Sequence, residues 1–173
     1  MLIVTEGLKT EVQYFEGLVQ FLRSSGTAVR GVRSKGIGKD PLRVLKAALD
    51  IDGADLDGFD EVWVVVDVDD HATLDTALVE GRSRDVPIVV SNPCFEIWLI
   101  WHYEDCAGHH DTKAALRRLA KYKHTDKSIP NTFPYDAFDE AERRAGDQVQ
   151  VWERGSNPST AMPKLLAALQ RRS

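Results

Sequence analysis

The stretch EVWVVVDVDD, residues 61–70, decides the fold of this chain. Its nearly unbroken run of Val and Trp predicts a strand buried on both faces, as in the centre of a parallel sheet. The run ends in acid, with Asp67 and Asp69 two positions apart. In an extended chain both carboxylates leave the same side of the strand. Two like charges held so close favour either a cation between them or protonation of one of them.

The size and composition of the chain predict one globular domain with a substantial core. It has 173 residues, of which 43% are hydrophobic and 28% charged. We expect a single domain over residues 1–173, with an α/β core over 1–105 and a helical C-terminal extension over 106–173. A second full domain is not expected.

Several classes of protein are disfavoured by the sequence. No stretch approaches the roughly 20 apolar residues that span a bilayer, and no signal-like leader follows Met1, so we expect a cytoplasmic protein with no membrane partner. Cys94 and Cys106 form no C-x-x-C pair, and we place both in one helical segment as free thiols. The net charge of −5 argues against a large non-specific nucleic-acid footprint but permits a local basic patch.

Strand and helix patterns alternate through the first hundred residues, and helices follow. This order predicts an open, mostly parallel four-stranded sheet with helices on both faces. We expect strands at 2–5, 27–35 (nearer an edge), 61–67 and 86–91. Three of the expected helices are defined by where they begin: one near residue 9, one after Asp40-Pro41 and one after Asn92-Pro93. The others are expected over residues 72–84, 112–123, 135–145 and 157–172. Asp40, Asn92 and the NPST at 157–160 serve as the helix-opening signals. The helix after Asn92 is apolar nearly all round, so it should be buried or covered by later chain.

Acidic residues follow three of the predicted strands. Glu6 follows the first strand, Asp67 and Asp69 the third, and Glu96 the fourth. Ligand sites of open parallel sheets form outside the carboxyl ends of the strands, so these side chains should converge. Carboxylates without histidine suit Mg²⁺ or Mn²⁺ rather than zinc. We therefore expect Glu6, Asp67 and Asp69 as metal ligands.

The expected roles follow from that chemistry. Asp67 and Asp69 would hold the cation, while Glu6 would act as general base or acid or hold a second ion. Lys9 and the amides that open the helix at Pro93 would add positive potential for a phosphate. The alternatives are structural: helix capping for the aspartates, complementing the helix dipole for Glu96, and a solvated side chain for Lys9. His102 is expected to pack inside its helix rather than bind metal.

Four motifs carry a resemblance to a known family. They are IVTEGLKTEVQYFEGL at 3–18, VVVDVDDH at 64–71, SNPCFEIWLIWHYE at 91–104 and NPST at 157–160. In order and spacing they resemble the RloB-like family of TOPRIM-fold proteins over nearly the whole chain. The resemblance implies a TOPRIM arrangement in which Glu6 with Asp67 and Asp69 binds Mg²⁺ for phosphodiester chemistry. The family's N-P-x-F-E motif adds Glu96 to the catalytic set.

The resemblance also implies a setting and partners. Similar proteins are small nucleases encoded beside an ATPase partner in prokaryotic anti-phage or abortive-infection systems. The KYKHTDK segment at 121–127 resembles the family's basic segment, which makes Lys121, Lys123 and Lys127 candidate contacts to a nucleic-acid backbone. The GIGKDP at 36–41 is not a Walker A loop, so the chain shows no ATP-binding motif of its own.

Three functions remain open at this point. The leading hypothesis is a metal-dependent nuclease that cleaves DNA or RNA under control of an ATPase partner. The second is a catalytically silent TOPRIM-fold module that binds a nucleotide or a protein. The third, a haloacid-dehalogenase-type phosphatase, is disfavoured because its D-x-D normally follows the first strand. A homodimer is open, with the apolar residues 94–105 as the first surface to examine, although core placement of Trp98 and Trp101 is the preferred interpretation.

Overall fold

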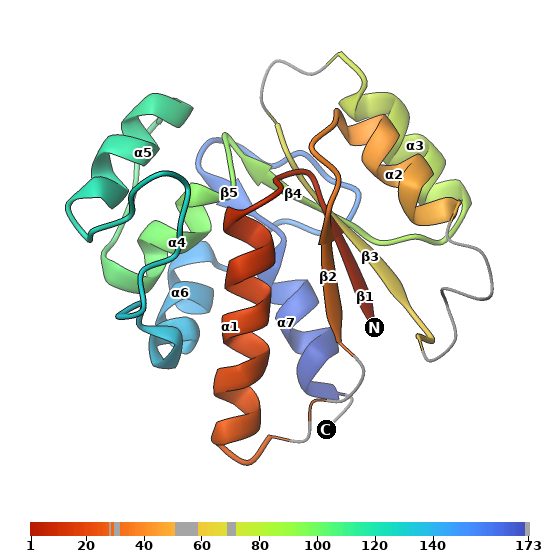
Figure 1. The fold of residues 1–173 in the computed structure, drawn as a ribbon. Helices are drawn as coiled ribbons and strands as arrows, with labels where there is room; N and C mark the ends of the chain where they lie inside the picture. The colour runs from red at the N-terminus through yellow and green to blue at the C-terminus, as the bar shows by residue number, and fades with distance from the viewer. Residues whose placement is uncertain (28, 30–31, 51–58, 69–71, 172–173) are drawn as a thin grey trace.

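The computed structural model describes the chain except for residues 28, 30–31, 51–58, 69–71 and 172–173 (Figure 1). The described residues form an α/β fold. The strands are β1 (Leu2–Thr5), β2 (Arg33–Gly36), β3 (Val62–Asp67), β4 (Ile88–Asn92) and β5 (Ser159–Thr160). The helices are α1 (Thr10–Ser24), α2 (Pro41–Leu49), α3 (Leu74–Ser83), α4 (Glu96–Tyr103), α5 (Thr112–Ala120), α6 (Phe138–Ala145) and α7 (Met162–Arg171), with a 3-10 turn at Tyr135–Ala137.

The sheet has the order β2-β1-β3-β4-β5. The first four strands run parallel, while β5 runs antiparallel to β4. This confirms an open, mostly parallel sheet with β2 at an edge. The predicted count of four strands was wrong, because five are formed by the described residues. Such an open, mostly parallel sheet places the ends of β1, β3 and β4 along one edge.

The fifth strand replaces part of a predicted helix. The NPST sequence was expected to open a helix at 157, but Ser159 and Thr160 pair with Asn92 and Ser91 of β4, and α7 begins only at Met162. The Ser91 and Thr160 hydroxyls are 2.9 Å apart in a buried hydrogen bond. A two-residue strand has no periodicity to detect, and its partner lies far away in the sequence.

Strand β3 is buried on both faces, as the sequence predicted. Trp63 and Val65 belong to the core cluster that includes residues of α1, α4 and α7. Val64 and Val66 belong to a second cluster with residues of α2 and α3. Figure 1 shows α2 and α3 together on one side of the sheet and α1 and α7 on the other. Successive side chains of β3 therefore pack alternately against the two helical layers on opposite faces of the sheet.

Helix α4 is covered by the chain that follows it. Trp98 is fully buried and Trp101 is 3% exposed. Residues of α5, α6 and α7 belong to the same core cluster as α4. The preferred core placement of both tryptophans is confirmed, so they offer no surface for a second copy of the chain.

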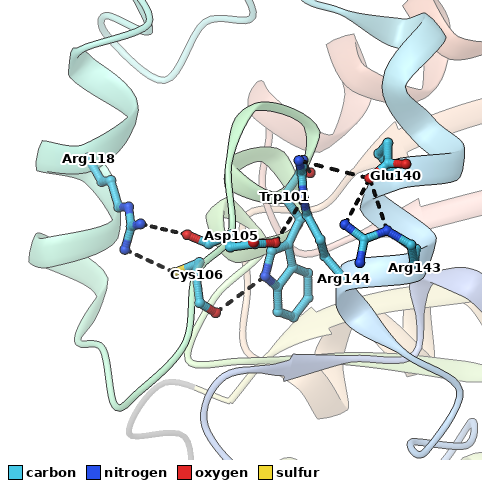
Figure 2. A network of polar contacts seen from close by, with 7 residues as sticks. All are labelled: Trp101, Asp105, Cys106, Arg118, Glu140, Arg143 and Arg144. Atoms are coloured by element: carbon cyan, nitrogen blue, oxygen red, sulfur yellow. Dashed lines mark hydrogen bonds and ion pairs between the residues drawn. The ribbon is translucent and has the colours of Figure 1, made fainter.

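A polar network joins the end of α4 to α5 and α6 (Figure 2). Arg144 of α6 donates to the Trp101 carbonyl and to Asp105. Arg118 of α5 donates to the Asp105 carbonyl at 2.7 Å and pairs with Glu104. The network fixes α5 at its place beside α4.

Of the predicted helix caps Asp40 and Asn92, the first is confirmed and the second is wrong. Asp40 does cap α2, since its carboxylate accepts a bond from the Arg43 amide at 3.4 Å. Asn92 does not cap α4: it is the last residue of β4, its side chain donates to the Gly155 carbonyl at 2.7 Å, and its peptide bond to Pro93 is cis. Helix α4 begins at Glu96, after Phe95. The Asn92 side chain, which the sequence predicted to cap a helix, is therefore bonded instead to a residue that is distant in the sequence.

Other expectations need smaller corrections. The strand predicted at 27–35 is found at 33–36, and parts of the earlier segment lie outside the described residues. Cys94 and Cys106 are both free and buried, but they flank α4 rather than lying in it. None of the helices in the described part of the chain is long and apolar enough to cross a bilayer.

The buried His102 should make stability depend on pH. Its ring packs against Tyr14, Trp98 and Phe133. Burial lowers its pKa from 6.5 to about 4. Because the pKa of His102 is lower in the folded chain than in the unfolded chain, the unfolding free energy is unaffected by this group above pH 6.5 and decreases as the pH falls toward 4. We expect His102→Phe to remove roughly 2–3 kcal/mol of the decline in unfolding free energy between pH 7 and 4.5.

Urea unfolding at a series of pH values measures this difference. His109→Ala, at an exposed position, is the control and should keep the wild-type pH dependence. Equal pH dependence of His102→Phe and wild type would contradict the assignment.

Candidate functional site

A cavity of about 510 Å³ opens at the carboxyl edge of the sheet. It collects four of the five side chains that the sequence singled out for chemistry. Its lining residues are Glu6, Gly7, Leu8, Lys9, Thr10, Glu11, Gly38, Lys39, Asp40, Asp67, Glu96, Thr112, Leu116 and Lys127. The fifth predicted residue, Asp69, lies outside the described residues, as does His71.

Backbone amides hold the first two carboxylates in place. The Glu6 carboxylate accepts a hydrogen bond from the Asp67 amide at 3.3 Å. The Asp67 carboxylate accepts one from the Phe95 amide at 2.8 Å. Glu6 itself donates its amide to the Val65 carbonyl at 3.0 Å. These bonds connect the ends of β1 and β3 with the residue that precedes α4.

Glu11 is a member of the site that the sequence analysis missed. It lies in the first turn of α1, is only 6% exposed, and accepts a hydrogen bond from the Gly7 amide at 2.9 Å. A Cβ atom at position 7 would lie 2.0 Å from the Glu11 Oε2 atom, so the carboxylate fits there because residue 7 is glycine. Burial raises the pKa of Glu11, and the charges of Glu96 and Glu6 raise it further.

Glu96 completes the acidic group. It is the first residue of α4 and is 8% exposed. The neighbouring Cys94 thiol has its pKa raised by burial and by the charges of Glu96 and Asp67. Glu96 is therefore a buried acid in electrostatic contact with the other carboxylates of the cavity.

Lysines lie around the same cavity. Lys9 donates to the Asp126 carbonyl at 3.0 Å, which ties α1 to the loop that follows α5. Thr10 donates its hydroxyl hydrogen to the Lys127 carbonyl at 2.9 Å. Lys127 lines the cavity, as does Lys39, which the sequence analysis did not single out. The cavity thus joins buried carboxylates with exposed ammonium groups.

The donor chemistry fits a hard cation. The acidic side chains offer oxygen only, which is the preference of Mg²⁺ and Mn²⁺. Burial is the main cause of the raised pKa of Glu11, and a cation would offset the smaller contribution from the charges of Glu96 and Glu6. In the described part of the chain, however, no group of three or more His, Cys, Asp or Glu side chains already stands at metal-binding geometry.

The comparison with known proteins identifies a family. The family model described as RloB-like protein matches residues 1–169. No significant match was found among curated proteins or among solved structures.

The charge on Glu11 should make the folded chain less stable as the pH rises. A carboxyl group with a raised pKa holds its proton more tightly in the folded chain, so stability falls as the pH rises through that pKa. Glu11→Gln keeps an acceptor for the Gly7 amide and removes the charge. We expect the unfolding free energy of Glu11→Gln to exceed that of wild type by more at pH 8 than at pH 4.5, in urea unfolding with EDTA present.

Glu16→Gln is the matched control, because Glu16 is an exposed glutamate on the same helix. It should show no such pH-dependent difference. A Glu11→Gln protein that loses stability relative to wild type as the pH rises would contradict the electrostatic account.

Proposed function

The chain belongs to the RloB-like family, and on this premise we propose that it is a metal-dependent nuclease that hydrolyses phosphodiester bonds in DNA or RNA. One observation carries the proposal: the carboxylates of Glu6, Glu11, Asp67 and Glu96 surround a single cavity whose lining also includes lysines. Acid groups suit a divalent cation, and lysines suit the phosphate that such a cation would bind.

The residues that would hold the ion are Glu6 and Asp67, with Asp69 as a ligand predicted from sequence alone. A bound Mg²⁺ or Mn²⁺ would supply Lewis-acid stabilisation of the phosphate charge and a more acidic water. The Glu6 and Asp67 carboxylates are already oriented by the Asp67 and Phe95 amides, so their placement requires no rearrangement of the sheet.

The remaining residues have separate tasks. Lys9, Lys39 and Lys127 would bind the phosphate oxygens from the cavity wall. Glu11 would hold or deliver a proton at its carboxylate, because burial and the charges of Glu96 and Glu6 raise its pKa and so favour its protonated form. Glu96 would stand beside it as a second acid. Leu8 and Leu116 would restrict water at the lip of the cavity.

The TOPRIM arrangement and the biological setting belong to the same proposal. We place the enzyme in the cytoplasm as the effector of an anti-phage or abortive-infection system, with an ATPase partner. The absence of a Walker A pattern at 36–41 is consistent with ATP hydrolysis by another protein. An ATPase reading frame next to this gene would support the setting.

Loss of the carboxylates should abolish cleavage. Glu6→Gln and Asp67→Asn keep side-chain size and remove charge, and we expect each to lower the Mg²⁺- or Mn²⁺-dependent cleavage rate by about 100-fold or more. The assay uses plasmid and structured RNA, with and without the partner ATPase. Glu16→Gln should cleave at the wild-type rate.

Cleavage that persists unchanged in both variants would show that the site is assigned wrongly. Wild-type protein that binds a nucleotide or a partner in calorimetry, with no metal-dependent turnover, would instead favour the alternative of a silent binding module.

Metal binding itself has a separate readout. Ligand at one hundred times its Kd stabilises a folded protein by about 2.7 kcal/mol. For a chain of this size that corresponds to a rise in Tm of roughly 5–10 °C. We expect Mn²⁺ to produce such a rise in differential scanning fluorimetry and Asp67→Asn to lose most of it. An equal rise in both proteins would place the ion elsewhere.

A further inference from the structure

A second cavity, of about 270 Å³, adjoins the proposed nuclease site. Thr10, Glu96, Leu116 and Lys127 line both cavities. The second cavity has its own lining of Leu99, Leu119, His124, Asp126 and Ser128. A group held in it would lie directly beside a phosphate held in the first.

The second cavity suits a flat, uncharged group. Leu99, Leu116 and Leu119 line it, with Leu116 as the exposed leucine, and His124 supplies a planar ring. The His124 ring is fixed by the Tyr103 hydroxyl, 3.0 Å from its Nε2 atom, and by edge contact with Phe133. Burial lowers the pKa of His124 to about 4, so the ring is neutral at physiological pH.

An exposed leucine stands between the two cavities. Leu116 is 37% exposed, and Leu8, at the lip of the first cavity, is 69% exposed. Within the described residues only one other large hydrophobic side chain, Val79, is exposed to this degree. Exposed leucines at a polar site are suited to wedging between bases or to packing against one apolar face of a base.

Positive charge lies along α5, the helix that carries Leu116, and along the loop after it. Lys113, Arg117, Lys121, Lys123 and Lys127 are exposed on α5 and the loop after it. The whole protein carries a net charge of −5, so this concentration of cations is local. Arg118 is not part of it, since it pairs with Glu104. A polyanion lying along α5 would therefore pass Leu116 and both cavities.

We propose that the substrate is single-stranded or unpaired nucleic acid, with one nucleobase next to the cleaved phosphate inserted into the second cavity against Leu116 and His124. This inference rests on the proposed nuclease function and specifies its substrate. A base in an intact duplex is stacked and paired, so it reaches such a cavity only after it has been flipped out. Single strands present their bases without that cost.

Removing single bases tests the inserted nucleobase. Labelled DNA and RNA oligonucleotides carry one abasic site, moved one position at a time past the cleavage position, and are compared with the same sequences as duplexes. Stacking of a base contributes about 1–3 kcal/mol, so one abasic position should lower kcat/KM by roughly 5- to 150-fold. The intact single strand should be cleaved faster than its duplex.

Two variants distinguish contacts with the nucleobase from contacts with the phosphate backbone. Leu116→Ala should weaken binding of single strands while leaving the weaker duplex binding unchanged, and Val79→Ala is its control at an exposed apolar position outside both cavities. Arg117→Glu should weaken both and reduce the salt dependence of binding. Fluorescence anisotropy in EDTA measures these affinities without cleavage.

The two proposals fail in different ways. Cleavage with no abasic-sensitive position, or equal cleavage of single strand and duplex, would overturn the base cavity and leave the nuclease intact. If no nucleic acid is cleaved, the EDTA binding data decide: single-strand preference that depends on Leu116 supports the base cavity, while equal binding of single strand and duplex overturns it.

Discussion

The parallel pairing of β1 with β3 is the constraint on which the site depends. The register sets Thr5 opposite Val65, so Glu6, one residue further along β1, and Asp67, two residues further along β3, emerge at the same edge of the sheet. The bond from the Asp67 amide to the Glu6 carboxylate then joins the two strand ends. A slip of one residue would turn the side chains of one strand to the opposite face, and the buried valines of β3 oppose it.

The burial of α4 extends this geometry beyond the sheet. Because α4 is apolar nearly all round, it requires cover on several sides, and α5, α6 and α7 provide it. Its buried start brings Glu96 to the cavity, while the arginine network at its end holds α5 in place. One hydrophobic helix thus positions an acid for the first cavity and Leu116 for the second.

The acidic group of the candidate site departs from what stability favours. Glu11 and Glu96 are charged residue types kept almost fully out of water, and burial penalises the charged form of Glu11. Such an arrangement is unfavourable in the metal-free chain, and a bound cation would offset it. Lys9, Lys39 and Lys127 nearby are exposed, so their charge is solvated. Under the proposed function that charge would be available to a phosphate.

The sequence by itself determined the alternation of elements, the central buried strand and the side of the sheet at which Glu6, Lys9, Asp67 and Glu96 gather, because each follows from local periodicity and the rule for parallel strand ends. Only the tertiary structure decided that Asn92 bonds to Gly155 rather than capping a helix, that Ser159–Thr160 forms a strand, and that Glu11 and Lys39 line the cavity. These features depend on partners distant in the sequence, or on burial that an amphipathic pattern does not reveal. The same applies to the second cavity, whose leucines and His124 meet only after α5 has docked against α4.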